Sequence, residues 1–559
     1  MSEQVVIERD VPCQLRDGVT LYANVYRPES EGEYPVLLTR LPYNKNLPNF
    51  SHRYIDPIRM ALDGYVVIIQ DVRGRFSSEG DFKPFAQELE DGYDSVEWAA
   101  SLPYSNGKVG MFGLSYYGFT QMFAAMAKPP SLKAIFPAFT GHNIDRDLSK
   151  RGGAYELAKL ETWMLDSVAP DYLKRIQDSE TFQKTSQELI ADLDHILDWH
   201  SHFPFKDWSP VMKHPELQEL YKAYIYGELS VNDRASIGDV NVPGFHMAGW
   251  YDCFLQATIH NFSELEKQGK DDQQLIIGPW GHGVFTPYFG ERYFGLKASG
   301  DLIDGVDDVT SLHLKWFDHW LKDDQTEVFE EDAPIKLFVM GANEWRSEYE
   351  WPLARTNYKP LYLHNHGQLS FDKPTESALD SYVYDPDNPV PTKGGPSLFI
   401  HGINTGPLDQ REVEKREDVL VYTSAPLGED IEVTGPVKFK LYASTDVVNT
   451  DFVVKLTDVL PDGKSINVTE GIVRTNTIHG ALKPGEVYEY EIDMWSTSQV
   501  FKKGHSLRVQ VTSSNFPMYD PNPNTGDTLL DTTKIINANQ TLHMGADYAS
   551  HIILPIIEG

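Results

Sequence analysis

The sequence predicts an α/β protein with three parts: a parallel β-sheet flanked by helices, a helical segment inserted into it, and a C-terminal all-β sandwich. Over residues 1–142, compact apolar runs such as YPVLLTRL, YVVIIQDV and KVGMFGL alternate with helical segments, as in βαβ units. Residues 143–238 show only helical periodicity, with charged faces. Beyond residue 335, alternating strands are broken by Gly, Pro, Asn and Asp, which is typical of a β-sandwich.

The order of these segments predicts the domain organisation. Strands return after the helical block with VPGFHMAGWYD and QQLIIGPWGHG, followed by the amphipathic segment DVTSLHLKWFDHWLK. We therefore expect a core formed by residues 1–142 and 239–330, with a helical cap inserted at 143–238. The acidic segment DDQTEVFEEDAP is typical of a linker, and the sandwich domain is expected at 331–559.

Composition excludes several classes of function. The chain has 559 residues and a net charge of −33, with 82 acidic against 49 basic residues, which argues against nucleic acid or an anionic membrane as a partner. Its two cysteines, Cys13 and Cys253, cannot form a disulfide framework or a cysteine-rich metal site. The N-terminus lacks a signal-like pattern, and the apolar runs are shorter than the ~20 residues of a membrane helix. We expect a cytoplasmic protein.

The stretch VGMFGLSYYGFT, residues 109–120, predicts a strand, a tight turn and a helix, with Ser115 at the turn. In the α/β-hydrolase fold the nucleophile occupies such a turn, flanked by glycines that permit close packing. Tyr117 stands where the second glycine of the usual pattern would be, and Gly118 follows it. Ser115 is therefore a candidate nucleophile, with a purely structural turn as the alternative.

Two later strand ends supply the partners that such a serine needs. The fold orders its catalytic residues Ser, Asp or Glu, then His; FHMAGWYDC ends one apolar strand with Asp252, and LIIGPWGHG ends the next with His282. His282 would act as the general base and Asp252 would orient it. The weaker candidates fall in a polar loop, within a strand or in a helical stretch: Asp271, Asp272, His246 and His260.

The oxyanion of an acyl-transfer intermediate needs hydrogen-bond donors in fixed positions. One is expected to be the backbone N–H of Tyr116, which follows the nucleophile. The HGGG loop that often supplies the other is absent, and LPYNKN stands at the equivalent place, after YPVLLTR. The hydroxyl of Tyr43 is therefore the candidate for the second donor. Neither a nucleotide-binding motif nor an H-E-x-x-H or Cys/His cluster occurs, so no metal or cofactor is expected.

These motifs resemble those of the cocaine esterase/X-Pro dipeptidyl-peptidase (S15) family, in particular its CocE/NonD-type α/β-hydrolases. The resemblance extends over almost the whole chain and is carried by RDGVTLYANVYRP, LPYNK, QDVRGRFSSEGDF, GLSYYG, AGWYD, GPWGH, VMGANEWR, DFVVKLTDVLPDG and SSNFPMYDPNPNTG. It implies an α/β-hydrolase core with an inserted helical cap and a C-terminal jelly-roll (galactose-binding-like) domain. It also implies a triad of Ser115, Asp252 and His282, with an oxyanion hole at Tyr116 and Tyr43.

Within the DVRGR turn, which also belongs to the family pattern, Asp71 and Arg73 are expected to hold a buried loop rather than to act in catalysis. Cys253, beside Asp252, is expected to be a small buried residue rather than a reactive thiol. Family members that act on α-amino acid esters place acidic residues just after the catalytic aspartate, whereas here Cys253, Phe254 and Leu255 follow. A free α-amino acyl group is therefore disfavoured, because a buried ammonium needs a counter-charge.

Phe254 and, in the cap, Trp163 are candidates for an apolar acyl pocket, with ordinary core packing as the alternative. The leading hypothesis is a serine carboxylesterase for small, largely apolar acyl esters. The alternatives are an X-Pro dipeptidyl peptidase, an amide or β-lactam acylase, and a non-catalytic binding protein. The partner is then a small-molecule ester or amide. The C-terminal domain would line the site or mediate self-association into a homo-oligomer.

Overall fold

The computed structural model describes residues 4–48, 52, 55–270, 272–322, 333–398 and 405–558. Most of the predicted acidic linker and Asp271 lie outside these residues. Ten strands of the described chain form one mixed sheet in the order β1-β2-β4-β3-β5-β6-β9-β10-β13-β14. Their bounds are β1 (Val5–Gln14), β2 (Thr20–Pro28), β3 (Tyr34–Leu41), β4 (Val66–Asp71), β5 (Ser105–Leu114), β6 (Leu132–Ala138), β9 (Gly244–Gly249), β10 (Gln273–Gly278), β13 (Ile335–Val339) and β14 (Glu344–Glu348).

The strands from β4 to β13 in this order run parallel, and both of their faces are covered. In β3, Val36 and Leu38 belong to one hydrophobic cluster and Leu37 to another, because successive side chains of a strand point to opposite faces. Helices α3 (Glu88–Ala100) and α4 (Tyr116–Ala127) contribute to the first cluster. Helices α2 (Pro57–Leu62) and α12 (Val309–Leu321) contribute to the second. This double burial explains why the central strands are continuous apolar runs.

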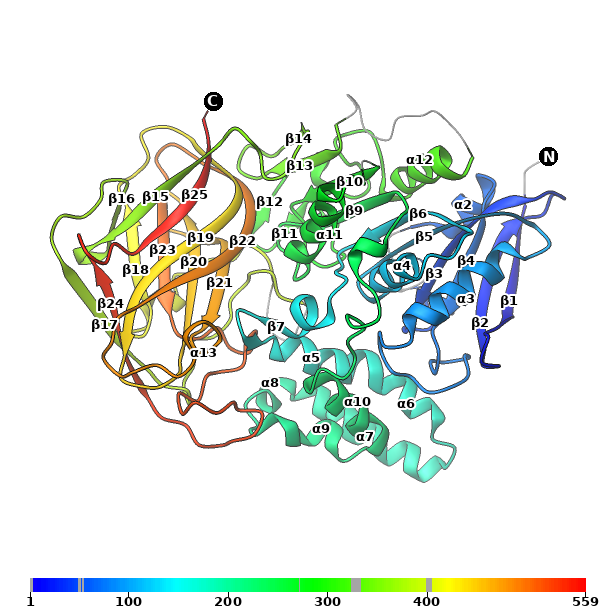
Figure 1. The fold of residues 1–559 in the computed structure, drawn as a ribbon, viewed down its shortest axis with the longest axis horizontal. Helices are drawn as coiled ribbons and strands as arrows, with labels where there is room; N and C mark the ends of the chain where they lie inside the picture. The colour runs from blue at the N-terminus through cyan, green and yellow to red at the C-terminus, as the bar shows by residue number, and fades with distance from the viewer. Residues whose placement is uncertain are drawn as a thin grey trace.

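A helical segment separates β6 from β9 and packs with the α3/α4 side of the sheet in one hydrophobic cluster. In Figure 1 it lies below the sheet domain, coloured cyan to green. Its elements are η1 (Asp145–Ser149), β7 (Lys150–Arg151), β8 (Ala154–Tyr155), α5 (Leu157–Trp163), η2 (Met164–Val168), α6 (Ala169–Arg175), α7 (Ser179–Asp194), α8 (Ile196–Trp199), η3 (Phe205–Asp207), α9 (Ser209–Met212), α10 (Pro215–Ile225) and η4 (Ile237–Asp239). The helices of this predicted cap thus occur where its periodicity indicates them.

Eleven C-terminal β-strands of the described chain form an all-β sandwich with its own hydrophobic cluster, coloured yellow-green to red in Figure 1. They are β15 (Thr356–His364), β16 (Gln368–Ser370), β17 (Ala378–Tyr384), β18 (Leu420–Ser424), β19 (Ile431–Thr445), β20 (Asp451–Val459), β21 (Ser465–Arg474), β22 (Tyr488–Phe501), β23 (Ser506–Thr512), β24 (Ala538–Met544) and β25 (His551–Ile557), with the short helix α13 (Asn476–His479).

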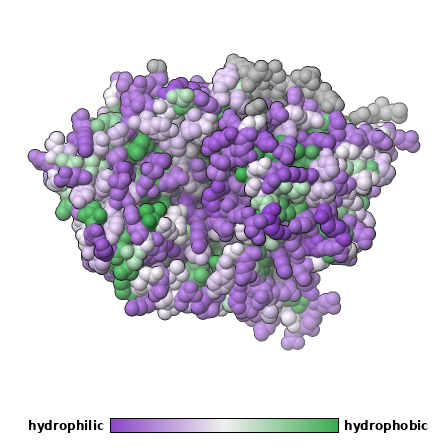
Figure 2. All heavy atoms as spheres, in the orientation of Figure 1, coloured by the Kyte–Doolittle hydropathy of each residue, from purple (hydrophilic) through white to green (hydrophobic). Residues whose placement is uncertain are grey.

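The described chain contains no helix whose length and hydrophobicity would suffice to cross a membrane. The face in Figure 2 is mainly hydrophilic, with hydrophobic residues in small groups.

One sequence-based assignment is wrong. We expected the strand IKLFVMG to belong to the sandwich, but β13 pairs in parallel with β10, and β14 pairs with β13. These two strands therefore extend the first sheet, and the sandwich strands begin with β15. A short apolar run does not encode which sheet it joins, because burial in either sheet requires the same side chains. The other domain limits stay predictions.

The parallel strands bring four turns to one edge of the sheet. The loops after β3, β5, β9 and β10 all leave the carboxyl ends of these strands, which is where open α/β sheets bind their ligands. The two short strands β11 (Tyr288–Phe289) and β12 (Arg292–Tyr293) and the helix η5 (Leu296–Ala298) follow the β10 loop, and α11 (Leu255–Lys267) follows the β9 loop.

The turn after β5 depends on Gly113, and this dependence can be tested. Its φ is +142°, and a Cβ there would lie 2.4 Å from Cδ2 of Tyr117 and 2.7 Å from the Tyr117 carbonyl oxygen. Because overpacking costs about 1–3 kcal/mol and the backbone disfavours a side chain, Gly113→Ala should lower the thermal unfolding midpoint. Gly428→Ala is the control, since a Cβ there meets nothing within 4 Å. Equal midpoints for the two variants would refute this account of the turn.

Candidate functional site

Ser115 stands at a strained turn between β5 and α4. Its backbone adopts φ 61° and ψ −127°, a region that non-glycine residues occupy only when the surrounding structure enforces it. The Ser115 N–H donates to the carbonyl of Ala138 (3.0 Å), and the Thr140 hydroxyl donates to the Ser115 carbonyl (3.0 Å). A Cβ on Gly118 would lie 2.5 Å from that of Thr140. The glycine one position later than in the usual motif is therefore needed for contact with the loop after β6.

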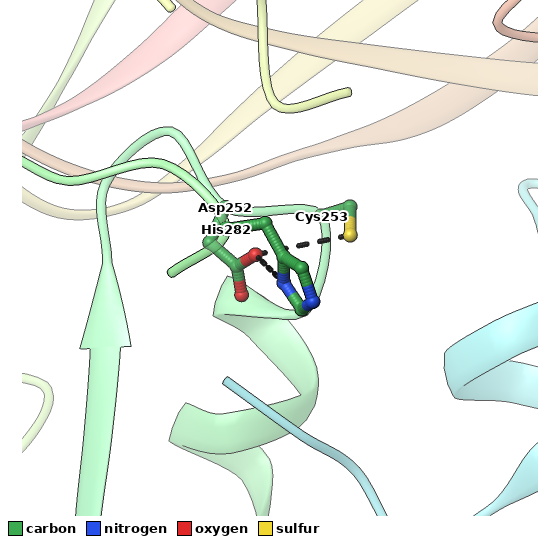
Figure 3. A group of neighbouring side chains, drawn as sticks. All are labelled: Asp252, Cys253 and His282. Atoms are coloured by element: carbon green, nitrogen blue, oxygen red, sulfur yellow. Dashed lines mark hydrogen bonds and ion pairs between the residues drawn. The ribbon is translucent and has the colours of Figure 1, made fainter. Parts of the chain in front are cut away.

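Asp252 and His282 form a hydrogen-bonded pair between the loops after β9 and β10. His282 Nδ1 lies 2.7 Å from Asp252 Oδ1, and the aspartate is fully buried. The backbone N–H of Phe254 donates to the other carboxylate oxygen at 3.0 Å. Because a carboxylate can only accept, Nδ1 carries a hydrogen, and in the neutral imidazole Nε2 is then the acceptor. Figure 3 shows the imidazole lying against the Asp252 carboxylate.

Aromatic contacts place His282 next to the serine turn. Its ring lies 5.5 Å from that of Phe254 and 6.2 Å from that of Phe139, between ring centroids. Phe139 directly follows Ala138, whose carbonyl binds the Ser115 N–H, and Phe254 lines the same pocket as Ser115. The His282–Asp252 pair therefore lies against Phe254, a lining residue of the pocket that Ser115 also lines, and the triad as a whole stays a prediction.

Both predicted oxyanion residues also line this pocket. The hydroxyl of Tyr43 accepts a hydrogen bond from the indole N–H of Trp163 at 3.2 Å. Tyr116 is the first residue of α4, so its N–H has no intrahelical acceptor. Its hydroxyl donates to the Glu88 carboxylate (2.9 Å) and accepts from the N–H of Phe85 (3.0 Å). These two bonds hold the Tyr116 side chain in place. The role that we expect for Tyr116 in the oxyanion hole belongs to its backbone N–H, not to this hydroxyl.

The pocket that contains Ser115 is narrow and mostly apolar, with a cavity volume of about 30 Å³. It is lined by Tyr43, Phe85, Ser115, Tyr116, Phe119, Leu148, Lys159, Leu160, Trp163, Tyr224, Phe254 and Leu398. Trp163 and Phe254, predicted as acyl-pocket residues, are thus both present. The sequence analysis missed Lys159 and Tyr224 of the cap and Leu398, which lies in the chain between β17 and β18. Nothing in the local sequence of Leu398 separates it from other loop residues, since only the docking of the sandwich brings it here.

Lys159 is the one ammonium group among these lining residues. Its side chain is buried and pairs with Glu156, and its Nζ lies 5.1 Å from the ring centroid of Phe254. Glu156 also faces the guanidinium of Arg151 at 3.5 Å. Lys159 therefore reaches the pocket near Phe254 as one member of an ion pair, and its partner carboxylate, Glu156, is shared with Arg151 outside the lining.

Cys253 is buried beside the acid–base pair. Its Sγ lies 3.8 Å from the same Asp252 oxygen that binds His282, and both contacts are drawn in Figure 3. Burial raises the pKa of the Cys253 thiol well above its usual value, and the Asp252 charge adds to this effect. Asp252, Cys253 and His282 place three ligand atoms within 4.8 Å of one another, as a metal site would. A metal ion bound to His282 Nδ1 and the Asp252 carboxylate would have to displace the proton of the hydrogen bond between these two residues. Metal binding here and the Asp252–His282 hydrogen bond are therefore mutually exclusive.

The weaker histidine candidates have structural surroundings. His246, inside β9, lies with Nε2 3.0 Å from the amide oxygen of Gln273 and is fully buried, and burial lowers its pKa to about 4. His260, on α11, lies 2.8 Å from the guanidinium of Arg146, and burial lowers its pKa to about 4. Asp272 lies in the loop before β10, where its carbonyl binds the Gly244 N–H. None of the three lines the pocket that contains Ser115.

In the DVRGR turn, Asp71 and Arg73 make the contacts of residues that hold a loop. The Asp71 carboxylate accepts from the backbone N–H of Lys45 (2.7 Å) and from its ammonium group (3.1 Å). Arg73 pairs with Asp91 at 2.7 Å and with Asp17 at 2.8 Å. Asp71 therefore secures the loop that carries Tyr43, and Arg73 joins the turn to α3.

Comparison with known proteins gives a consistent assignment. The family model described as X-Pro dipeptidyl-peptidase (S15 family) matches residues 17–284, and that of the X-Pro dipeptidyl-peptidase C-terminal non-catalytic domain matches residues 326–553. The chain is 36% identical to the cocaine esterase of Rhodococcus sp. (strain MB1 Bresler), over 99% of each chain. Two solved structures share the fold at 24% identity. They are an α-amino acid ester hydrolase (TM-score 0.75, 99% of this chain, 97% of that one) and an aminopeptidase from a marine sediment Thaumarchaeota archaeon (TM-score 0.76, 100% and 97%). These matches confirm the predicted fold class.

The surroundings of Cys253 predict an unreactive thiol. Because burial raises its pKa, the thiolate that reacts with alkylating agents is scarce at neutral and mildly alkaline pH. Iodoacetamide at pH 8 should leave Cys253 and the buried Cys13 unmodified in the folded protein and should modify both in guanidinium chloride, as measured by peptide mass spectrometry. Rapid labelling of Cys253 in the folded protein, with loss of activity, would reverse this assignment.

Proposed function

Because this chain belongs to the cocaine esterase/X-Pro dipeptidyl-peptidase (S15) family of serine hydrolases, we propose that it cleaves esters of small, largely apolar acyl groups. Ser115 is the nucleophile, His282 the general base and Asp252 the residue that orients it. The observation that carries this proposal is the 2.7 Å pair of His282 and Asp252 beside the pocket that Ser115 lines.

In the first step, Ser115 Oγ attacks the ester carbonyl carbon while His282 Nε2 takes the hydroxyl proton. The buried Asp252 carboxylate stabilises the imidazolium that forms and maintains the tautomer in which Nε2 accepts. The tetrahedral intermediate then collapses, the bond from carbon to the alkoxy oxygen breaks, and His282 returns the proton to that oxygen. Water repeats the sequence on the acyl-enzyme and releases the carboxylic acid.

The developing oxyanion is stabilised by the Tyr116 N–H and the Tyr43 hydroxyl. The helix N-terminus at Tyr116 contributes a partial positive charge in addition to the hydrogen bond. Tyr43 can donate to the oxyanion while its oxygen accepts from Trp163, because a phenol has one donor and free lone pairs. Each such donor contributes about 10²–10³ in rate.

The lining of the pocket supports the proposed acyl specificity. Trp163, Phe254 and Leu398 present apolar surface beside Ser115, which suits an aromatic or branched aliphatic acyl group. The lining residues of the described chain include no Asp or Glu, and Lys159 contributes a cation. A substrate with a free amine would therefore bury its ammonium near a like charge. This favours simple acyl esters over aminoacyl esters and over the free N-terminus of an X-Pro peptide.

Ser115→Ala tests the nucleophile. The hydroxyl contributes little to packing at this half-exposed turn, so the variant should keep the wild-type unfolding midpoint and lose ester hydrolysis by at least about 10³-fold. A fluorophosphonate probe should label the Ser115 peptide of the wild type and leave the variant unlabelled, as read by mass spectrometry. Ser101→Ala, at the exposed end of α3, serves as the control. Activity of Ser115→Ala near that of the wild type would remove Ser115 from the mechanism.

The charge at Lys159 predicts discrimination against amines. At a pH where the amine is protonated, methyl 3-phenylpropanoate should have a kcat/KM about 10²-fold higher than phenylalanine methyl ester, because burying an uncompensated charge costs several kcal/mol. Lys159→Met should reduce this ratio of kcat/KM values, since it removes the like charge from the pocket and leaves the Glu156 carboxylate paired with Arg151 alone. Equal kcat/KM values of the wild type for the two esters would show that the Lys159 charge does not select against amines.

A further inference from the structure

Arg75, in the turn after β4, joins two separate parts of the chain through their main-chain carbonyls. Its side chain is buried, and its Nε donates to the Pro42 carbonyl at 2.9 Å. Its two Nη atoms donate to the carbonyls of Ser167 (2.8 Å) and Val168 (3.2 Å). Pro42 lies in the loop after β3, whereas Ser167 and Val168 end the π-helical turn η2 of the cap.

Each of these parts carries a residue of the pocket. Pro42 directly precedes Tyr43, and η2 directly continues α5, which ends at Trp163. The Trp163 indole N–H and the Tyr43 hydroxyl are hydrogen-bonded at 3.2 Å. One guanidinium therefore determines the spacing of two segments whose side chains meet beside Ser115.

The surroundings of Arg75 stabilise a buried cation. Asp171 lies 3.4 Å from its Nη1, and the rings of Phe76 and Phe82 lie 5.0 Å from its Cζ. Burial lowers the pKa of the Arg75 guanidinium to about 10, so it stays charged at neutral pH. Lysine cannot replace it in this role, because three carbonyls in two directions need the planar set of donors that only a guanidinium provides.

We propose that Arg75 is a positioning residue that couples the cap to the oxyanion hole by fixing the Tyr43 hydroxyl relative to Trp163. This inference rests on the proposed function, in which Tyr43 donates to the oxyanion. Asp71 holds the same loop on its other side through Lys45, so Tyr43 lies between two anchored residues. Since a displacement of about 1 Å at a reacting group can cost about 10²-fold in rate, loosening one anchor should affect catalysis before it affects folding.

The test is a double-mutant cycle with Tyr43→Phe, measured on an ester whose acylation is rate-limiting. Tyr43→Phe should lower kcat about 10²–10³-fold, and Arg75→Lys should lower it about 10–100-fold, with a smaller change in KM in both cases. In the Tyr43→Phe background, Arg75→Lys should change kcat by less than about threefold, because the hydroxyl that it positions is gone. Equal losses in both backgrounds, or no loss from Arg75→Lys, would overturn the inference and leave the triad untouched.

Two further variants keep the test decisive. Arg73→Lys is the matched control in the same turn, since Arg73 binds Asp91 and Asp17 and neither the Tyr43 loop nor the cap; its kcat should match that of the wild type. If Arg75→Lys fails to fold, Arg75→Gln replaces it, because Asp171 keeps its ion pair with Arg175 at 2.9 Å. A Tyr43→Phe variant with wild-type kcat would overturn both the oxyanion assignment and this inference, whereas an inactive Ser115→Ala would still support Ser115 as the nucleophile.

Discussion

The strained backbone at Ser115 is the constraint on which the rest of the site depends. A positive φ at a serine is unfavourable by itself, and the surrounding contacts maintain it: the carbonyl of Ala138, the hydroxyl of Thr140, and two glycines that have no room for a Cβ. Ser115 and Tyr116 both line the pocket, and Tyr116, as the first residue of α4, has an N–H without an intrahelical acceptor. The positions of β6 and its following loop are therefore as important for the conformation of Ser115 as the motif that contains it.

Buried charged groups hold Tyr43 and Tyr116, two lining residues of the pocket. Arg40 pairs with Glu88, which holds the Tyr116 hydroxyl, and Lys45 and Arg75 hold the loop of Tyr43 from its two ends. Isolated buried pairs of this kind rarely add net stability, because the charges lose their hydration. Their partners are specific, however, and each pair fixes a residue that we assign to the oxyanion hole or to its support. Positioning, rather than stability, explains why a protein would retain so many of them beside one pocket.

The sandwich and the cap are coupled to the same pocket. Leu398 lines the pocket that contains Ser115, and main-chain hydrogen bonds join the sandwich to the cap: the Ala158 N–H donates to the Pro517 carbonyl and the Phe205 N–H to that of Leu529. Helix α5, which carries Lys159 and Trp163, is therefore held by the sandwich at its start and by the Arg75 turn after its end. A shift of the sandwich relative to the cap would thus displace α5 and, with it, the pocket residues Lys159 and Trp163.

The sequence by itself determined the elements and their chemistry. Apolar runs marked the strands, and the later strand ends identified Asp252 and His282, which the structure brings together, with Ser115 in the strand–Ser–helix pattern as their predicted partner. It could not assign β13 and β14 to the first sheet, because pairing partners depend on contacts between distant segments. Likewise, only the tertiary structure shows that Leu398 and Lys159 line the pocket and that Arg75 joins the Tyr43 loop to the cap. A buried contact between segments far apart in the chain leaves no periodic or motif signal in either of them.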